Sequence, residues 1–212
     1  MCLYPKLIKN RKYTVNKKNG GNIPAVLDNR VLLVPVGCGN CIECRKQKAR
    51  EWQIRLFEEV RNRKDGKFVT LTFSNEKLTE LLKEHKNKFK GLTAYNLDNR
   101  IATVATRLFL ERWRKKYKKS LRHWLVTELG HNGTENIHLH GILWTDKIEQ
   151  IEKIWSYGYV WTGKNENGKI INYVNEKTVN YIIKYVTKMD EKHKTYKSII
   201  LTSPGKIGRA HV

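Results

Sequence analysis

The sequence predicts an α+β fold in which helices flank a central five-stranded antiparallel sheet. Five short segments have the composition and alternation of strands, and longer segments between them repeat apolar residues at helical spacing. Turn-forming residues separate two pairs of neighbouring strands, which favours hairpins. The order is strand, helices, two strands, helix, two strands, helix. Such an order is typical of one antiparallel sheet with helices packed on it.

The N-terminal part, residues 1–44, is expected to form a basic arm that carries a cysteine cluster. It is rich in Asn and Gly, and Gly20 and Gly21 indicate a turn. A helix is expected over residues 45–61, where Trp52, Leu56 and Val60 make an apolar stripe. We therefore expect a division into this arm, a main domain at residues 45–205 and a short tail.

The first strand of the main domain is expected at residues 67–73, where apolar and Thr positions alternate. Ser74 or Asn75 can cap the helix that follows, through about residue 86. A second helix is expected over residues 97–118.

Two further strands, at residues 123–129 and 137–144, are expected to pair as a hairpin across the turn at residues 130–133. A short helix should follow at residues 146–155. Residues 157–162 and 169–174 flank Asn-Glu-Asn-Gly and predict a second hairpin. The last element is a helix over residues 176–188.

The charge balance points to a polyanionic partner. The chain has 42 Lys+Arg against 20 Asp+Glu, a formal charge of +22. Solubility is the simpler explanation, but the excess favours nucleic acid. No segment approaches the roughly 18 apolar residues that a membrane span needs. The N-terminus lacks the apolar core of a secretory signal, so a cytoplasmic protein without a membrane partner is expected.

His138 and His140 are candidate metal ligands, because alternate residues of a strand point to one face. A third ligand should come from a neighbouring strand. Glu128 is the best candidate and Glu135 the weaker one. Two imidazoles and a carboxylate suit Mg²⁺ or Mn²⁺, although these ligand types also fit zinc. The ion would act as a Lewis acid.

Tyr181 and Tyr185 are candidate nucleophiles on one face of the last helix, one turn apart. A phenol with a pKa near ~10 needs a polarised target or a nearby cation. Lys184 and Lys188 follow the two tyrosines at the same spacing and could stabilise the developing charge. The alternative is that both rings only pack against the sheet. The histidines favour the catalytic interpretation.

Two further groups could bind ligands. Cys38, Cys41 and Cys44 could hold a structural Zn²⁺ if Cys2 or a histidine supplied the fourth ligand; an iron–sulfur cluster and plain thiols are the alternatives. The basic end of the helix at residues 97–118 could follow a DNA backbone or simply face solvent. Its candidate DNA contacts are Arg112, Arg114, Lys115 and Lys118.

Three motifs in this order resemble those of HUH endonucleases, the superfamily of rolling-circle replication initiators: the strand at residues 68–73, His138-Leu139-His140, and the helix with both tyrosines. The doubled Tyr-x-x-Lys unit resembles the initiators of Microviridae, small single-stranded DNA phages. Residues 36–45 are similar to the gokushovirus-like branch. The similarity covers about residues 35–205. The loop at residues 131–136 departs from it, because it lacks an expected Arg-Pro.

The resemblance implies a ferredoxin-like or RRM-like HUH fold and a defined reaction. His138, His140 and Glu128 would hold the metal, and Tyr181 or Tyr185 would attack single-stranded origin DNA. The products would be a 5′-phosphotyrosine and a 3′-hydroxyl that primes the host replication machinery in the bacterial cytoplasm. The second tyrosine would then cut after one round, so that the ends of the circular genome are rejoined.

Two other functions fit parts of the sequence. A relaxase or single-strand transposase shares the histidine strand, and a non-catalytic, zinc-stabilised nucleic-acid-binding module would explain the charge and the aromatics. Residues 206–212 match the translation of a common sequencing adapter, so we expect a non-native or disordered tail there.

Overall fold

The computed structural model describes residues 2–130, 135–163, 172–188, 192–193, 195–203 and 207. The chain forms two compact units, Met1–Lys48 and Ala49–Val212. Helix α1 (Ile42–Asn62) begins in the first unit and ends in the second. The predicted division at residues 44 and 205 stays a prediction.

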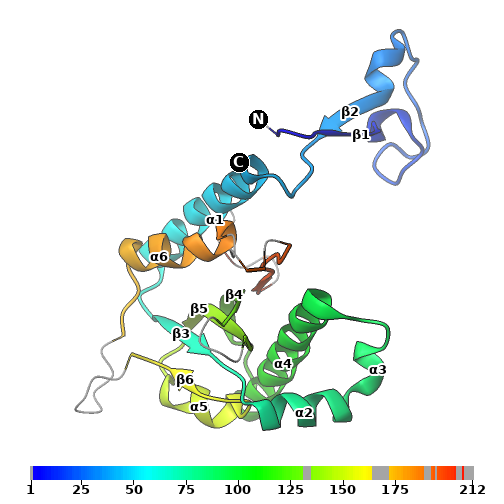
Figure 1. The fold of residues 1–212 in the computed structure, drawn as a ribbon. Coiled ribbons are helices and arrows are strands. Elements are labelled where there is room, and N and C mark those ends of the chain that lie inside the picture. Colours follow the sequence, from blue (N-terminus) through cyan, green and yellow to red (C-terminus); the bar gives the residue numbers. More distant parts are fainter. Residues whose placement is uncertain are drawn as a thin grey trace. The chain divides into compact units, whose positions relative to one another are not determined.

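The second unit is built on a five-stranded antiparallel sheet, which confirms the predicted fold class (Figure 1). The strand order is β6-β3-β5-β4-β7, so the two longest strands, β4 and β5, lie at or next to the centre. The strands are β3 (Gly66–Leu71), β4 (Arg122–Leu129), β5 (Ile137–Trp144), β6 (Val160–Trp161) and β7 (Ile200–Thr202).

The fifth strand is not the predicted one. Residues 172–174 form no strand, and residues 169–171 lie outside the described residues. The side chain of Asn172 instead accepts a hydrogen bond from the Phe68 N–H (2.9 Å) and donates to the Phe68 carbonyl (2.6 Å). This amide satisfies backbone groups of β3 that a paired strand would otherwise bind. The fifth strand is β7, which pairs with β4 from Trp124 to Val126.

The helices lie close to their predicted positions. Ser74 caps α2, because its hydroxyl accepts a hydrogen bond from the Lys77 N–H. A capping box between Asn175 and Thr178 starts α6. The helices that follow α1 are α2 (Asn75–Glu84), α3 (Lys86–Phe89), α4 (Ala94–Tyr117), α5 (Glu149–Trp155) and α6 (Glu176–Thr187).

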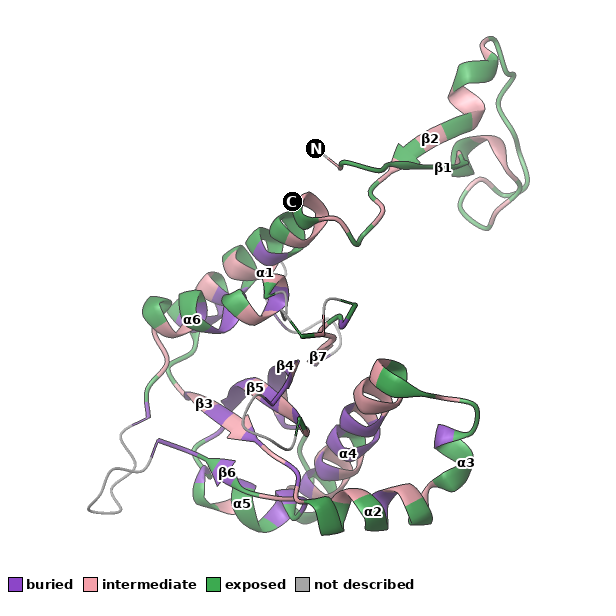
Figure 2. Ribbon diagram, in the orientation of Figure 1, coloured by how far each residue is buried: buried purple, intermediate pink, exposed green. Residues whose placement is uncertain are grey.

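Each face of the sheet is covered by a different set of helices. Odd-numbered residues of β4, such as Leu125 and Leu129, pack with the apolar side of α4, which is buried toward the sheet (Figure 2). Even-numbered residues, such as Trp124 and Val126, pack with α6 and the part of α1 from Ala49 onward. The alternation of side chains along β4 and β5 therefore assigns each residue to one of two cores.

The first unit is a small two-stranded hairpin. Strand β1 (Lys6–Lys9) pairs antiparallel with β2 (Leu33–Val36), and two short 3₁₀ helices, Arg11–Tyr13 and Asn29–Leu32, lie between them. The sequence did not predict these strands, because Lys and Pro are poor strand formers and every residue of β1 is exposed.

Two further predictions concern the chain's surroundings and its end. Among the described residues, no helix combines the length and the apolarity that crossing a membrane requires. Ile207 is buried and packs with the α1–α6 side of the sheet. The rest of the expected tail, residues 206 and 208–212, lies outside the described residues, so that prediction is not tested.

Candidate active site

Strand pairing brings the predicted metal ligands together. His138 and His140 share the face of β5 that α6 covers, and β4 runs antiparallel beside them. In this register Glu128 lies directly opposite His138, and Val126 lies opposite His140. Opposite residues of an antiparallel pair project to the same face. Glu128 therefore stands beside both imidazoles.

Glu128 joins the histidines to α6 through its two carboxylate oxygens. Oε2 lies 2.8 Å from Nε2 of His140, and Oε1 accepts a hydrogen bond from the Lys188 ammonium. Burial acts to raise the pKa of Glu128, but the hydrogen bonds with His140 and Lys188 outweigh it, so the pKa lies below its usual range. The carboxylate is thus ionised at neutral pH.

Thr70 orients one of the imidazoles. It lies opposite His140 in the β3–β5 register, and its hydroxyl is 3.0 Å from Nδ1 of His140. With Nδ1 held by Thr70, Nε2 points to the Glu128 carboxylate. A partner on the second nitrogen is the usual support of a histidine that binds metal. The sequence showed the alternating threonines, but only the register selects Thr70.

The tyrosines meet the histidine strand through one stacked ring. The ring of Tyr185 lies parallel to that of His140, at 4.4 Å between centroids. The Tyr185 hydroxyl donates to the Tyr181 hydroxyl at 2.8 Å, and the Tyr181 ring packs edge-on against Phe68. Burial, the Tyr181 hydroxyl and the Glu128 charge all raise the pKa of Tyr185. Tyr181 is about half exposed.

The two lysines that looked equivalent in the sequence differ in the structure. Lys188 binds Glu128 and lies 5.8 Å from the centre of the Tyr185 ring. Lys184 lies on the exposed side of α6. The difference arises because α6 ends at Thr187, which lets Lys188 leave the helical path and turn toward β4.

Two glycines keep the space around the histidines open. A Cβ at Gly130 would lie 2.6 Å from Cε1 of His138, and a Cβ at Gly141 would lie 2.0 Å from the backbone oxygen of Trp124. Gly130 therefore sets where the His138 ring can lie, and Gly141 lets β4 and β5 approach. Sequence reasoning missed both roles, because no local pattern marks them.

A family model for the replication-associated protein ORF2 family matches residues 66–190, more than half of the 212-residue chain. The chain belongs to this family. No curated protein and no solved structure matches the chain. The match begins at the first residue of β3 and ends just beyond α6, so it contains every residue of the site described above. Membership of this family supports a replication initiator, and DNA is the partner that the charge favours.

The weaker candidate for a third ligand lies elsewhere in the family domain. Glu135 faces His193, with 3.3 Å between its Oε1 and Nε2 of that histidine. The contact between Glu128 and His140 makes Glu128 the better placed of the two carboxylates.

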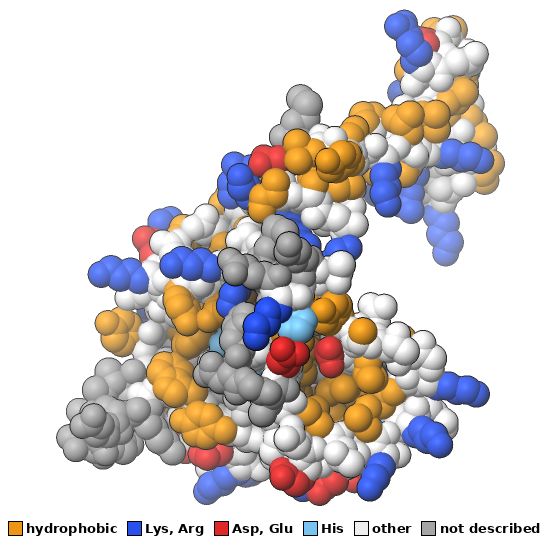
Figure 3. All heavy atoms as spheres, in the orientation of Figure 1, with side chains coloured by type: hydrophobic (Ala, Val, Ile, Leu, Met, Phe, Trp, Pro, Cys, Tyr) orange, Lys and Arg blue, Asp and Glu red, His pale blue; other side chains and the backbone are white. Residues whose placement is uncertain are grey.

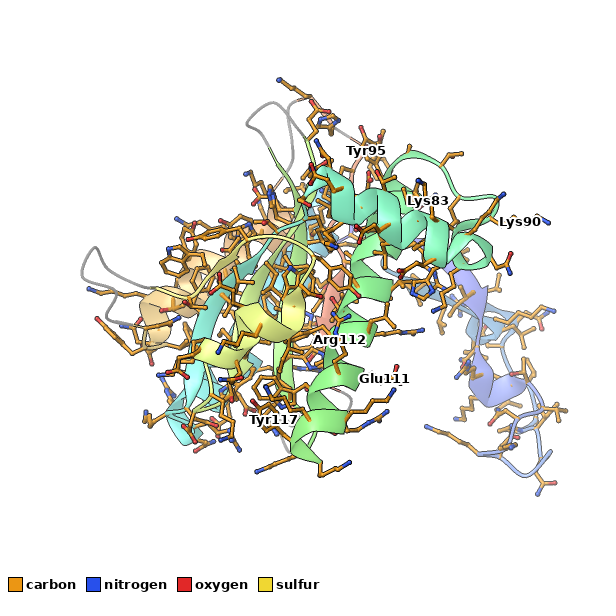
Figure 4. All side chains as sticks on the ribbon, turned by 90° about the horizontal axis from the view of Figure 1, so that it is seen from below. Lys83, Lys90, Tyr95, Glu111, Arg112 and Tyr117 are labelled. Atoms are coloured by element: carbon orange, nitrogen blue, oxygen red, sulfur yellow. The ribbon has the colours of Figure 1, made fainter. Side chains whose placement is uncertain are left out.

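The basic end of α4 lies on the opposite face of the sheet from the histidines (Figure 4). Arg112 turns inward: its guanidinium donates to the Trp155 carbonyl (2.9 Å) and the Tyr157 hydroxyl (3.2 Å). Lys115 pairs with Glu111 along the helix, whereas Arg114 and Lys118 are exposed. Figure 3 shows Lys and Arg side chains spread over the visible face rather than gathered in one patch. DNA binding by the predicted four residues stays a prediction, and the inward contacts of Arg112 give it no support.

The cysteines lie outside the part of the chain that the family model matches. The structure brings Cys38, Cys41 and Cys44 together and adds Cys2, with one sulfur of each within 4.8 Å of the others. Their spacing in the sequence predicted the group of three, and the fold selects Cys2 rather than a histidine beside them.

Proposed function

We propose that this chain is a rolling-circle replication initiator of the HUH endonuclease type, which nicks single-stranded origin DNA through a tyrosine. The observation that carries the proposal is the stack of Tyr185 on His140, with the Tyr181 hydroxyl 2.8 Å from that of Tyr185. It gathers two phenols, two imidazoles and a carboxylate at one point of the sheet.

The side chains of His138, His140 and Glu128 fit Mg²⁺ or Mn²⁺. The 2.8 Å between Glu128 Oε2 and His140 Nε2 is close to the roughly 3 Å that separates adjacent ligands of an octahedral ion with about 2.1 Å bonds. Thr70 holds the other nitrogen of His140, so that Nε2 can serve as a ligand. A bound divalent ion supplies Lewis-acid stabilisation of the charge on the scissile phosphate.

The reaction is a displacement at phosphorus. The phenol oxygen of one tyrosine forms a bond to phosphorus as the bond from phosphorus to the 3′-oxygen breaks. The phenol gives up its proton, and the departing oxygen takes one up to become a 3′-hydroxyl. Lys188, which binds Glu128 beside the Tyr185 ring, adds positive charge where the phosphate gains negative charge. Lys184 lies farther out on the helix, so its predicted catalytic role rests on spacing alone.

We assign the first cut to Tyr181. Its oxygen accepts a hydrogen bond from Tyr185, and a donor stabilises a developing phenolate. Tyr185 is the poorer first nucleophile, because burial raises its pKa. The two oxygens are neighbours, so Tyr185 can act at the same phosphate site once Tyr181 carries the DNA. This alternation serves the second cut that frees and closes a circular genome.

The narrower assignment to Microviridae rests on the doubled Tyr-x-x-Lys unit. It includes single-stranded origin DNA and the host replication machinery as partners, and the bacterial cytoplasm as the location.

The test uses single-stranded fragments that tile the genome encoding the chain, with Mn²⁺, labelled at either end. A covalent adduct that survives denaturation is expected only with the 3′-labelled strand, because the tyrosine stays on the 5′-phosphate. Tyr181→Phe should slow adduct formation more than Tyr185→Phe, and the double variant should form none. Tyr173→Phe, at an exposed tyrosine just before α6, is the matched control.

An adduct that persists in the double variant would disprove the assigned nucleophiles. An adduct on the 5′-labelled strand would reverse the polarity and contradict the mechanism. DNA binding without an adduct on any fragment would favour the non-catalytic binding module instead.

A further inference from the structure

The unit Met1–Lys48 has no hydrophobic core. None of its described residues is buried, whereas the second unit contains two buried clusters (Figure 2). Large apolar side chains such as Leu7 and Leu27 are exposed. Figure 3 shows apolar atoms on the surface of this unit. A two-stranded hairpin is marginal by itself in water, and units of this size usually need a disulfide or a metal ion to stay folded.

The four cysteines are the one place where distant parts of this unit converge among its described residues. Cys2 precedes β1, Cys38 and Cys41 follow β2, and Cys44 lies in the first turn of α1. The Sγ atoms of Cys2 and Cys41 are 3.8 Å apart, and those of Cys38 and Cys44 are 4.0 Å apart. No pair is bonded as a disulfide.

These distances are those of a tetrahedral metal site. Four sulfurs at about 2.3 Å from one zinc ion lie about 3.8 Å from each other, whereas a disulfide needs about 2.05 Å. In an iron–sulfur cluster the thiolates bind different irons and are spread farther apart. One mononuclear ion therefore fits the spacing better than a cluster or a disulfide.

The backbone around the sulfurs is arranged to accept negative charge. The N–H groups of Asn40 and Cys41 donate to Sγ of Cys38 at 3.4 and 3.3 Å. The N–H groups of Tyr4 and Cys38 donate to Sγ of Cys2 at 3.4 and 3.2 Å. Hydrogen bonds to a sulfur favour the thiolate, which is the form that binds metal.

We propose that Cys2, Cys38, Cys41 and Cys44 bind one Zn²⁺ ion, and that this ion is the structural core of the unit Met1–Lys48. Four protein ligands close the coordination sphere, so the ion has a structural and not a catalytic role. Each thiol loses its proton as its sulfur becomes a ligand. The site lies outside residues 66–190 and does not depend on the proposed nicking reaction.

Such an ion has two effects on this unit. It ties the chain before β1 to the chain after β2, so the hairpin is closed at its open end. Four thiolates and one dication also carry a net charge of −2 within a segment that has ten Lys and Arg against two acidic residues. The centre therefore offsets part of the repulsion among the basic side chains.

The experiment measures metal in the purified full-length chain after dialysis against metal-free buffer. We expect close to one zinc per chain and little iron. Cys41→Ser should lose the zinc, and so should Cys2→Ser, whereas Cys2→His should keep most of it because imidazole also binds zinc. The double variant His138→Ala/His140→Ala should keep its zinc, which separates this site from the proposed catalytic one.

A second measurement covers variants that do not fold. Wild-type protein reconstituted with Co²⁺ should show the thiolate-to-cobalt charge-transfer band and the intense visible bands of a tetrahedral ion. A chelator should then expose residues 1–48 to protease before the remainder of the chain. Iron in place of zinc, less than a fifth of a zinc per chain with all four thiols reactive, or zinc that is lost in the histidine variant and kept in Cys41→Ser would each overturn the proposal.

Discussion

Replacing Gly130 with alanine tests whether the position of the His138 ring sets the rate of DNA cleavage. The added Cβ would lie 2.6 Å from Cε1 of His138 and 3.0 Å from the backbone oxygen of Asn136. Ordinary contacts of this kind begin at 3.4 Å. The ring must therefore move by at least about 0.8 Å, because the backbone oxygen on the other side cannot yield as easily.

A shift of this size at a metal ligand has a large expected cost. Misplacing a group by ~1 Å can lower a rate by about 100-fold, which corresponds to about 2.7 kcal/mol of activation free energy. The fold should survive, since His138 is only partly buried and the chain at Gly130 does not have a positive φ. A glycine-to-alanine change also stabilises by about 0.4–1 kcal/mol through the unfolded chain.

The assay is single-turnover formation of the DNA adduct at increasing Mn²⁺, with the midpoint of thermal unfolding measured in parallel. Gly130→Ala should show the slower rate and a higher half-saturating Mn²⁺ concentration. Gly66→Ala is the control, because its Cβ would meet its neighbours at 3.3–3.4 Å at the far end of β3. A folded Gly130→Ala protein with the wild-type rate and metal dependence would refute the reasoning.

Three other predictions follow from contacts of the site and of the sheet. Thr70→Val removes the hydroxyl that holds the second histidine and should weaken Mn²⁺ binding about 10-fold; Thr72→Val, whose hydroxyl bonds a backbone carbonyl, should not, and equal effects in calorimetry would contradict this. Glu59→Ala leaves the 2.6 Å partner Arg122 unpaired and should cost about 3 kcal/mol in urea unfolding, whereas replacing both by Met should cost far less. The depressed pKa of Glu128 adds stability that is complete above its unfolded pKa and is lost as pH falls through the folded value, so Glu128→Gln in metal-free protein should flatten the acid side of the unfolding curve; parallel curves would argue against it.

Residues with a clear local pattern were well predicted. The alternation at residues 67–73 gave β3, and the cap at Ser74 gave the start of α2. The segment at residues 169–174 failed for a local reason that the pattern hides. A side-chain amide, that of Asn172, takes the hydrogen bonds of the sheet edge in place of a strand backbone. Composition does not distinguish these two solutions.

The sequence by itself determined which residues carry the chemistry: the two histidines of one strand, the two tyrosines of one helix, and the tight cysteine cluster. These patterns are short and follow from the periods of strand and helix. The tertiary structure alone decided their partners. It placed Thr70 on His140, stacked Tyr185 on the same ring, and brought Cys2 to the other thiols. Those pairings join residues far apart in the chain, and they depend on strand register and helix packing, which local spacing does not encode.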